Sequence, residues 1–99
     1  MHLVQILLPL KTSSDGRQAS FEAVLETLTS EFGGATAFVN SPARGLWEDA
    51  GEIEQDRIVT VEAMVEDFDI DWWADYRKHL ETLFAQEEIV VRAVEIIRV

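Results

Sequence analysis

The 99-residue sequence predicts an α+β fold in which two helices cover one face of an antiparallel β-sheet. Apolar residues recur at helical spacing along Phe21–Phe32, whereas along Arg57–Glu66 they alternate with other residues, as in a strand. The predicted segments follow one another in the order strand, helix, strand, strand, helix, strand. Because short connections and right-handed crossovers are the rule, this order indicates the ferredoxin-like βαββαβ plait with a four-stranded antiparallel sheet.

The first strand is predicted over Leu3–Leu10, an apolar run that Pro9 and the following polar residues bring to an end. Both faces of this run are mostly apolar, which is typical of a central strand. The first helix follows, and Gly33 is well placed as the left-handed residue beyond its end. Since phosphate-binding glycines precede a helix, Gly33 and Gly34 do not indicate a nucleotide-binding loop.

A short strand over Ala35–Asn40 and a loop over Ser41–Gly51, signalled by proline and glycine, are expected next. The strand Arg57–Glu66 then carries valines and alanine on one face. The second helix is predicted over Ile70–Ala85, because aspartates near its start can cap it and favour the positive end of its dipole. The last strand is predicted over Glu87–Val94, and we expect residues 1–99 to form a single domain.

One face of such a sheet would have no helix over it. The residues expected to line this open face are Leu3, Gln5, Leu7, Thr36, Phe38, Ile58, Thr60, Glu62, Met64, Val90 and Arg92. That set is too apolar to face only water, and the last strand would be a long hydrophobic edge. We therefore expect a homodimer formed through the open sheet face or through the C-terminal edge strand.

The net charge of −11 argues against two classes of partner. Such a negative field repels nucleic-acid backbones and anionic membranes, so neither partner is expected. The absence of cysteine excludes disulfides and thiolate zinc sites. The apolar start lacks a basic segment and a cleavage site, so it does not resemble an export signal, and a cytoplasmic location is expected.

A set of short motifs resembles a family of small hypothetical bacterial proteins of similar length. The motifs are Phe32-Gly33-Gly34-Ala35-Thr36, Gly45-Leu46-Trp47, Tyr76, and Phe84-Ala85-Gln86-Glu87-Glu88-Ile89-Val90-Val91. The resemblance covers most of the chain and implies a ferredoxin-like fold without an established activity. A plait that dimerises through its sheet is also similar to the dimeric α/β-barrel proteins, a group with many functions.

The candidates for catalysis are Glu62, Tyr76 and His79, and each has a structural interpretation that is more common. Glu62 would suit acid–base chemistry if buried, but an ion pair with a base on a neighbouring strand, such as Arg92, explains it as well. Tyr76 matches the buried stripe of the second helix, as do the two tryptophans before it. His79 lies among charged residues, where histidines are usually solvated.

Arg44 and Trp47 are the strongest candidates for binding a ligand, with Thr36 and Arg92 as further candidates. A guanidinium holds a carboxylate through two parallel hydrogen bonds, and an indole offers a flat apolar wall with one donor. The competing interpretation is that Trp47 covers the sheet or reaches a partner subunit. No metal site is expected, because the only helical pair with suitable spacing lacks a third ligand.

Two functions fit these observations. The preferred hypothesis is a small non-enzymatic oligomeric module that binds a small molecule or a protein partner, because no catalytic set is evident. The alternative is a cofactor-independent enzyme of the dimeric α/β-barrel type, similar to monooxygenases or isomerases, in which Glu62, Tyr76 or His79 transfers a proton. Neither hypothesis requires a cofactor.

Overall fold

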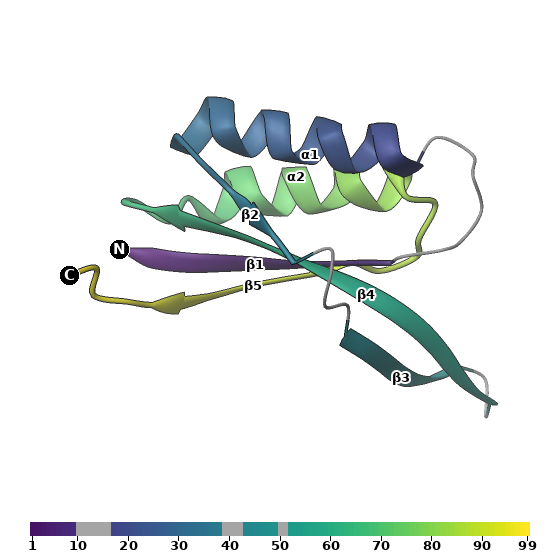
Figure 1. Ribbon diagram of the computed structural model, residues 1–99. Coiled ribbons are helices and arrows are strands. Elements are labelled where there is room, and N and C mark those ends of the chain that lie inside the picture. The colour runs from purple at the N-terminus through teal and green to yellow at the C-terminus, as the bar shows by residue number, and fades with distance from the viewer. Residues whose placement is uncertain (10–16, 39–42, 50–51) are drawn as a thin grey trace.

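The computed structural model describes residues 1–9, 17–38, 43–49 and 52–99. Within them, the helices and strands follow one another as in Figure 1: β1 (His2–Pro9), α1 (Arg17–Phe32), β2 (Thr36–Ala37), β3 (Ala43–Asp49), β4 (Glu52–Val65), α2 (Ile70–Leu83) and β5 (Val90–Glu95).

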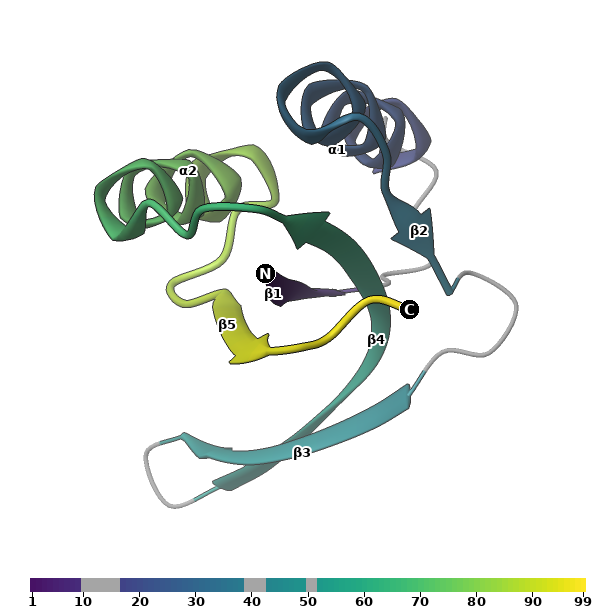
Figure 2. The same cartoon turned by 90° about the vertical axis from the view of Figure 1, so that its left-hand side faces the viewer.

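The strands form one antiparallel sheet in the order β2-β4-β1-β5, and β3 pairs with the first half of β4. Figures 1 and 2 show α1 and α2 side by side on one face, while no helix of the described residues lies over the other. This arrangement confirms the predicted ferredoxin-like fold. The central position of β1 agrees with its two apolar faces, since Ile6 lies opposite Val61 on β4 and Val91 on β5.

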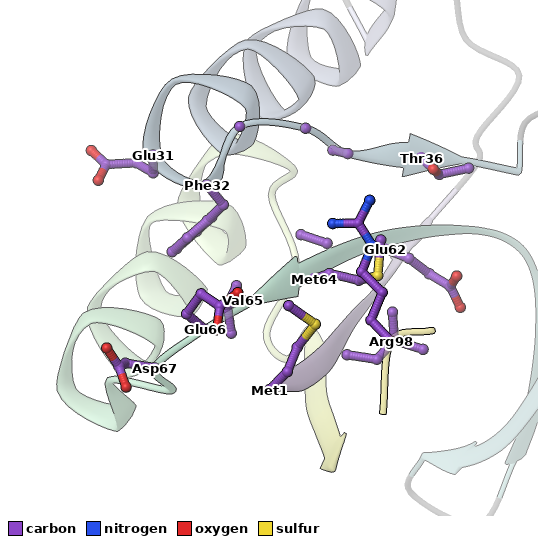
Figure 3. A pocket seen from close by; sticks show the side chains of 15 residues that line it. Met1, Glu31, Phe32, Thr36, Glu62, Met64, Val65, Glu66, Asp67 and Arg98 are labelled. Atoms are coloured by element: carbon purple, nitrogen blue, oxygen red, sulfur yellow. The ribbon is translucent and has the colours of Figure 1, made fainter. Parts of the chain in front are cut away.

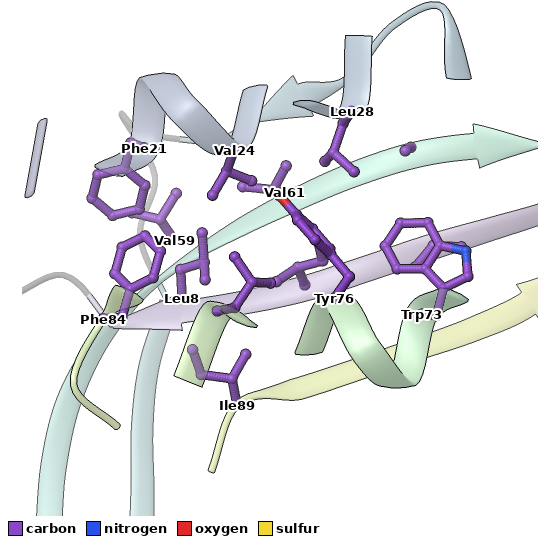
Figure 4. Packing of buried hydrophobic residues seen from close by; sticks show 14 of the residues in the cluster. Leu8, Phe21, Val24, Leu28, Val59, Val61, Trp73, Tyr76, Phe84 and Ile89 are labelled. Carbon is purple, nitrogen blue, oxygen red and sulfur yellow. The ribbon is translucent and has the colours of Figure 1, made fainter. Parts of the chain in front are cut away.

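The hydrophobic core lies between the two helices and the sheet (Figure 4). Along β4, the valines and alanine at odd-numbered positions from Val59 to Val65 are buried, as their alternation predicts. The helices contribute Leu28 and Leu80, both with none of their surface exposed. Burying one such side chain stabilises the fold by about 2 kcal/mol, so this layer carries most of the hydrophobic stabilisation.

Aromatic rings join the end of α1 to the start of α2. Phe32 stacks on Trp73 with 5.2 Å between ring centroids and meets Trp72 edge-on at 5.1 Å. Tyr76 lies one turn further along α2 and contacts both tryptophans. Because Trp73 and Tyr76 are buried and Trp72 is half-buried, the prediction that these rings pack in the core is confirmed.

Side-chain and backbone caps set the helix ends. The Asp69 carboxylate accepts hydrogen bonds from the N–H groups of Asp71 and Trp72, at 3.1 and 3.2 Å, and so caps α2. Gly33 follows α1 with φ 88° and donates its N–H to the Thr29 carbonyl, as predicted. Ala85 follows α2 with φ 52°, a left-handed conformation that strains an alanine.

The predicted loop over Ser41–Gly51 is wrong for Ala43–Asp49, which forms β3. This segment pairs residue by residue with Glu52–Ile58 and makes a hairpin with β4. Its glycine and charged residues hide the strand from a sequence pattern, whereas backbone hydrogen bonds to β4 stabilise it. The same pairing carries β4 back to Glu52, five residues before its expected start at Arg57.

Two other strands are shorter than expected. Within the described residues β2 covers only Thr36–Ala37, although the Phe38 N–H still donates to the Thr60 carbonyl; positions 39 and 40 of the predicted strand lie outside the described residues. β5 begins at Val90 instead of Glu87, since the Ile89 N–H donates to the Glu81 carboxylate on α2 and not to β1. Both changes shorten edge strands and leave the plait unchanged.

Candidate functional site

A row of polar side chains crosses the face of the sheet that the helices do not cover. The Gln5 amide nitrogen donates to the Glu62 carboxylate at 2.8 Å, and the Arg92 Nε donates to the Gln5 amide oxygen at 3.0 Å. The strand register aligns these residues, and Thr36 lies opposite Glu62 on β2. We call Thr36, Glu62, Gln5 and Arg92 the polar row.

The polar row corrects one prediction. Glu62 and Arg92 were expected to pair directly from neighbouring strands, but β1 lies between β4 and β5. Gln5 therefore connects the two charges, because its amide both donates and accepts. Three sequence candidates (Thr36, Glu62 and Arg92) thus lie in one row. Gln5, which links Glu62 to Arg92, was expected on the open face but was not among the site candidates. Its signal is that it is the one non-apolar, non-proline residue in an apolar run.

Mostly apolar side chains flank the polar row on both sides. The register places Met64, Leu3 and Val94 together in one flanking row and Thr60, Leu7 and Val90 in the other. Met64 is 45% exposed, Val94 54% and Val90 42%, which is unusual for three apolar residues on one sheet face. Met64 and Val90, both expected on this face, are therefore exposed apolar side chains, whereas Ile58, which was also expected there, is buried.

The three catalytic candidates do not meet. Glu62 lies on the open face, whereas Tyr76 is buried in the helix-covered core. Burial raises the pKa of the Tyr76 hydroxyl above its ordinary value of 10.0, and a hydrogen bond with Thr27 on α1 acts in the opposite direction. His79 is exposed on α2, with its ring stacked on Tyr76 at 6.0 Å between centroids. The sheet therefore separates Glu62 from both.

Arg44 and Trp47 belong to β3, where their backbones lie opposite Arg57 and Glu54 of β4. Their side chains lie outside the described part of the chain, so their role in ligand binding stays a prediction. Leu46, between them, has 56% of its surface exposed. Figure 2 shows the hairpin of β3 and β4 curving away from the helices on the open side of the sheet.

A groove of about 780 Å³ lies at one end of the open face (Figure 3). Its walls include the link through Gly33 and Gly34 and the side chains of Glu62 and Met64. Arg98 also lines it, because the chain turns back after β5, where the Ile96 N–H donates to the Met1 carbonyl. Arg98 is a second residue that the sequence did not indicate, since this turn depends on a contact between the two ends of the chain.

The ionisable side chains of the described residues include no group of three that could hold a metal ion. Neither helix in the described part of the chain is long and apolar enough to cross a membrane.

No family model matches the sequence, and no curated protein matches it. Solved structures match it over nearly its whole length. CutA1 from Pyrococcus horikoshii OT3, crystallised as a point variant, is 19% identical with a TM-score of 0.63, over 100% of this chain and 86% of that chain. The periplasmic divalent cation tolerance protein CutA from Archaeoglobus fulgidus is 17% identical with a TM-score of 0.61, over 99% and 86% of the two chains.

A third structure, the PII-like protein CutA from Nostoc sp. PCC 7120 in apo form, is 15% identical. Its TM-score is 0.61, and the match covers 97% of this chain and 81% of that chain. At such low identity, these matches show that the protein shares the fold of CutA proteins.

Proposed function

We propose that the protein is a small non-enzymatic module that assembles into a homo-oligomer through its open sheet face and binds a small molecule or a protein partner. The observation that carries this proposal is the polar row flanked by three exposed apolar side chains, Met64, Val94 and Val90. A stable contact between copies combines apolar area with a few satisfied polar groups in the same way.

The polar row is complementary to a second copy of itself. It has the Glu62 carboxylate on β4, the Arg92 guanidinium on β5 and Gln5 midway between them. A two-fold axis along β1 would place Gln5 over the partner's Gln5 and bring each Glu62 to the partner's Arg92. Two-fold symmetry is the commonest in homo-oligomers, so we propose a homodimer, with the β5 edge as the second route to association.

The proteins of similar fold support a binding module and suggest ligands to test. One is named a PII-like protein and another a divalent cation tolerance protein. The name of the second protein makes a divalent cation one ligand to test beside small molecules and protein partners, although the described residues offer no group of three metal ligands. A ligand held between copies would fit both the small size of the chain and the position of the open face.

The enzyme alternative has less support. It requires proton transfer by Glu62, Tyr76 or His79, and the sheet separates the first from the other two. The groove beside Glu62 contains neither Tyr76 nor His79. The cytoplasmic location stays a prediction, because one protein of similar fold is named as periplasmic.

Native mass spectrometry of protein purified gently from its own host tests the proposal. We expect a mass equal to a whole-number multiple of the 11.2 kDa chain, two copies for the homodimer, with an added mass if a ligand is retained. A monomer at all concentrations up to about 100 μM, well above a typical micromolar Kd, would contradict the proposal. Addition of a chelator shows whether any added mass is a metal ion.

A further inference from the structure

We infer that the open edge of β4, near Val65, binds an extended segment of another protein that carries lysine or arginine. The segment would lie as an added strand between β4 and the link from α1 to β2. This site uses the backbone edge of β4, whereas the proposed contact between copies uses the open sheet face, and the two sites share the side chains of Glu62, Met64 and Thr36 at their border. Separate measurements of peptide binding and of self-association therefore distinguish failure of one from failure of the other.

β4 continues beyond its pairing with β2. β2 pairs only with Val61 and Glu62, and the described part of the chain offers no partner on that side for residues 63–65. The Phe38 N–H donates to the Thr60 carbonyl at 2.9 Å, so Thr60 turns its backbone groups toward β2. Because these directions alternate along an antiparallel strand, Met64 turns its N–H and C=O to the same side. Met64 therefore offers a donor and an acceptor to an added strand.

The groove along this edge has room for another backbone. In Figure 3 the link between Phe32 and Thr36 runs beside the groove, apart from β4, and Gly33 and Gly34 of this link line the groove. A Cβ at Gly34 would meet no atom within 4 Å, and Gly34 lacks the left-handed conformation of Gly33. Nothing in the described chain requires a glycine at position 34, and its missing side chain leaves this wall open to close approach.

The charge of the groove favours a basic segment. Its ionisable groups are the carboxylates of Glu31, Glu62, Glu66 and Asp67, the Arg98 guanidinium and the Met1 amino group. Carboxylates thus outnumber positive groups by two to one, and the residues Glu31, Glu66 and Asp67 are exposed. The fourth carboxylate, that of Glu62, is half-buried and already accepts a hydrogen bond from Gln5. Charge complementarity of this kind selects a partner with lysine or arginine and rejects an acidic one.

The first experiment measures amide hydrogen exchange by NMR with two probe peptides, acetyl-Val-Lys-Val-Arg-Val-amide and acetyl-Val-Glu-Val-Glu-Val-amide. In the free protein, the Met64 amide should exchange faster than those of Ala63 and Val65, whose N–H groups face β1. The basic peptide should slow exchange at Met64 about tenfold, which corresponds to 90% occupancy of the edge. The acidic peptide should have no effect.

Three results would overturn the inference. One is equal protection of Met64 by the two peptides, and another is no protection by the basic peptide at millimolar concentration. The third is protection of Met64 that rises with protein concentration alone, because a second copy would then occupy this edge.

Paired charge reversals test the recognition without touching the core. Glu31→Lys combined with Glu66→Lys should raise the Kd of the basic peptide about tenfold, since two exposed attractions become repulsions. The matched control, Glu87→Lys with Glu88→Lys, makes the same charge change on exposed residues between α2 and β5, and should leave the Kd within about twofold. Equal effects of the two pairs would show only a general charge effect and would overturn the site.

The substitution Arg98→Gln tests whether the groove recognises a basic ligand or an anionic one. Because Arg98 repels a basic segment, its removal should leave the Kd of the basic peptide unchanged or lower it. A rise of tenfold or more in this Kd would mean that the groove recognises an anion, and the inference would fail.

Discussion

The two faces of the sheet are formed by alternate residues of the same strands, yet only one face is completed within the described chain. On the covered face, Ile6 and Val61 are each 1% exposed beneath the helices. On the open face, apolar residues such as Val94 keep about half of their surface exposed. The difference shows that a strand can be apolar on both faces for two reasons, since one face stabilises the monomer and the other is available for association.

The largest expected effect comes from a cavity on the covered face. Leu80→Ala removes a side chain with no exposed surface and should lower the free energy of unfolding by about 3 kcal/mol. Val94→Ala, on the open face, should change it by less than about 0.5 kcal/mol under conditions where the protein is monomeric. Urea unfolding of both variants measures the difference, and equal losses would break the comparison between the faces.

A charge on the open face should prevent association and preserve the fold. Val94→Glu places a carboxylate among the apolar residues of a flanking row, so the dissociation constant of the oligomer should rise about 100-fold. Leu83→Glu, at a 38% exposed position on α2, is the matched control and should leave association unchanged. Sedimentation velocity measures the association of both variants, and a loss of association in the control alone would place the contact between copies on the helices.

Tyr76, which is buried between the helices and the sheet, should make the stability of the folded protein depend on pH. Burial raises its pKa in the folded protein, so the neutral hydroxyl is favoured there more than in the unfolded chain. The stabilisation that this raised pKa contributes to the folded state is fully present below pH 10, the ordinary pKa of tyrosine. It declines as the pH rises above 10 toward the pKa of Tyr76 in the folded protein.

In Tyr76→Phe, this loss of stability above pH 10 should be smaller than in the wild type. At pH 7, the variant should lose about 1 kcal/mol with the Thr27 hydrogen bond. Unfolding at pH 7 and pH 10.5 measures both effects, and an identical pH dependence of the two proteins would show that Tyr76 is not the cause.

The smallest expected effect lies at the end of α2, on neither face of the sheet. Ala85→Gly relieves a left-handed alanine with φ 52° and should raise the free energy of unfolding by about 0.5–1 kcal/mol. It should not alter association, so it shows what a purely local backbone change does. A decrease in stability would mean that the Ala85 methyl group makes contacts worth more than the strain.

Burial of one face of a helix or strand requires apolar residues at regular spacing in the sequence, and this spacing is why the helices and the strands β1 and β4 could be predicted. β3 could not, because its pairing with β4 uses backbone groups and its residues show no alternation. The candidate site divides in the same way. The sequence indicates Glu62 as a catalytic candidate and Arg92 as its partner or as a ligand-binding residue, but their connection through Gln5 depends on the register of three strands, which no local pattern encodes.

A charge-swap cycle tests most directly the claim that the polar row is the contact between copies. Sedimentation equilibrium would compare the wild type, Glu62→Arg, Arg92→Glu and the double variant. Each single change puts like charges together across the two-fold axis and should raise the dissociation constant about tenfold or more. The double variant restores opposite charges and should recover most of the affinity. Four equal dissociation constants, or a double variant weaker than both single ones, would contradict the account.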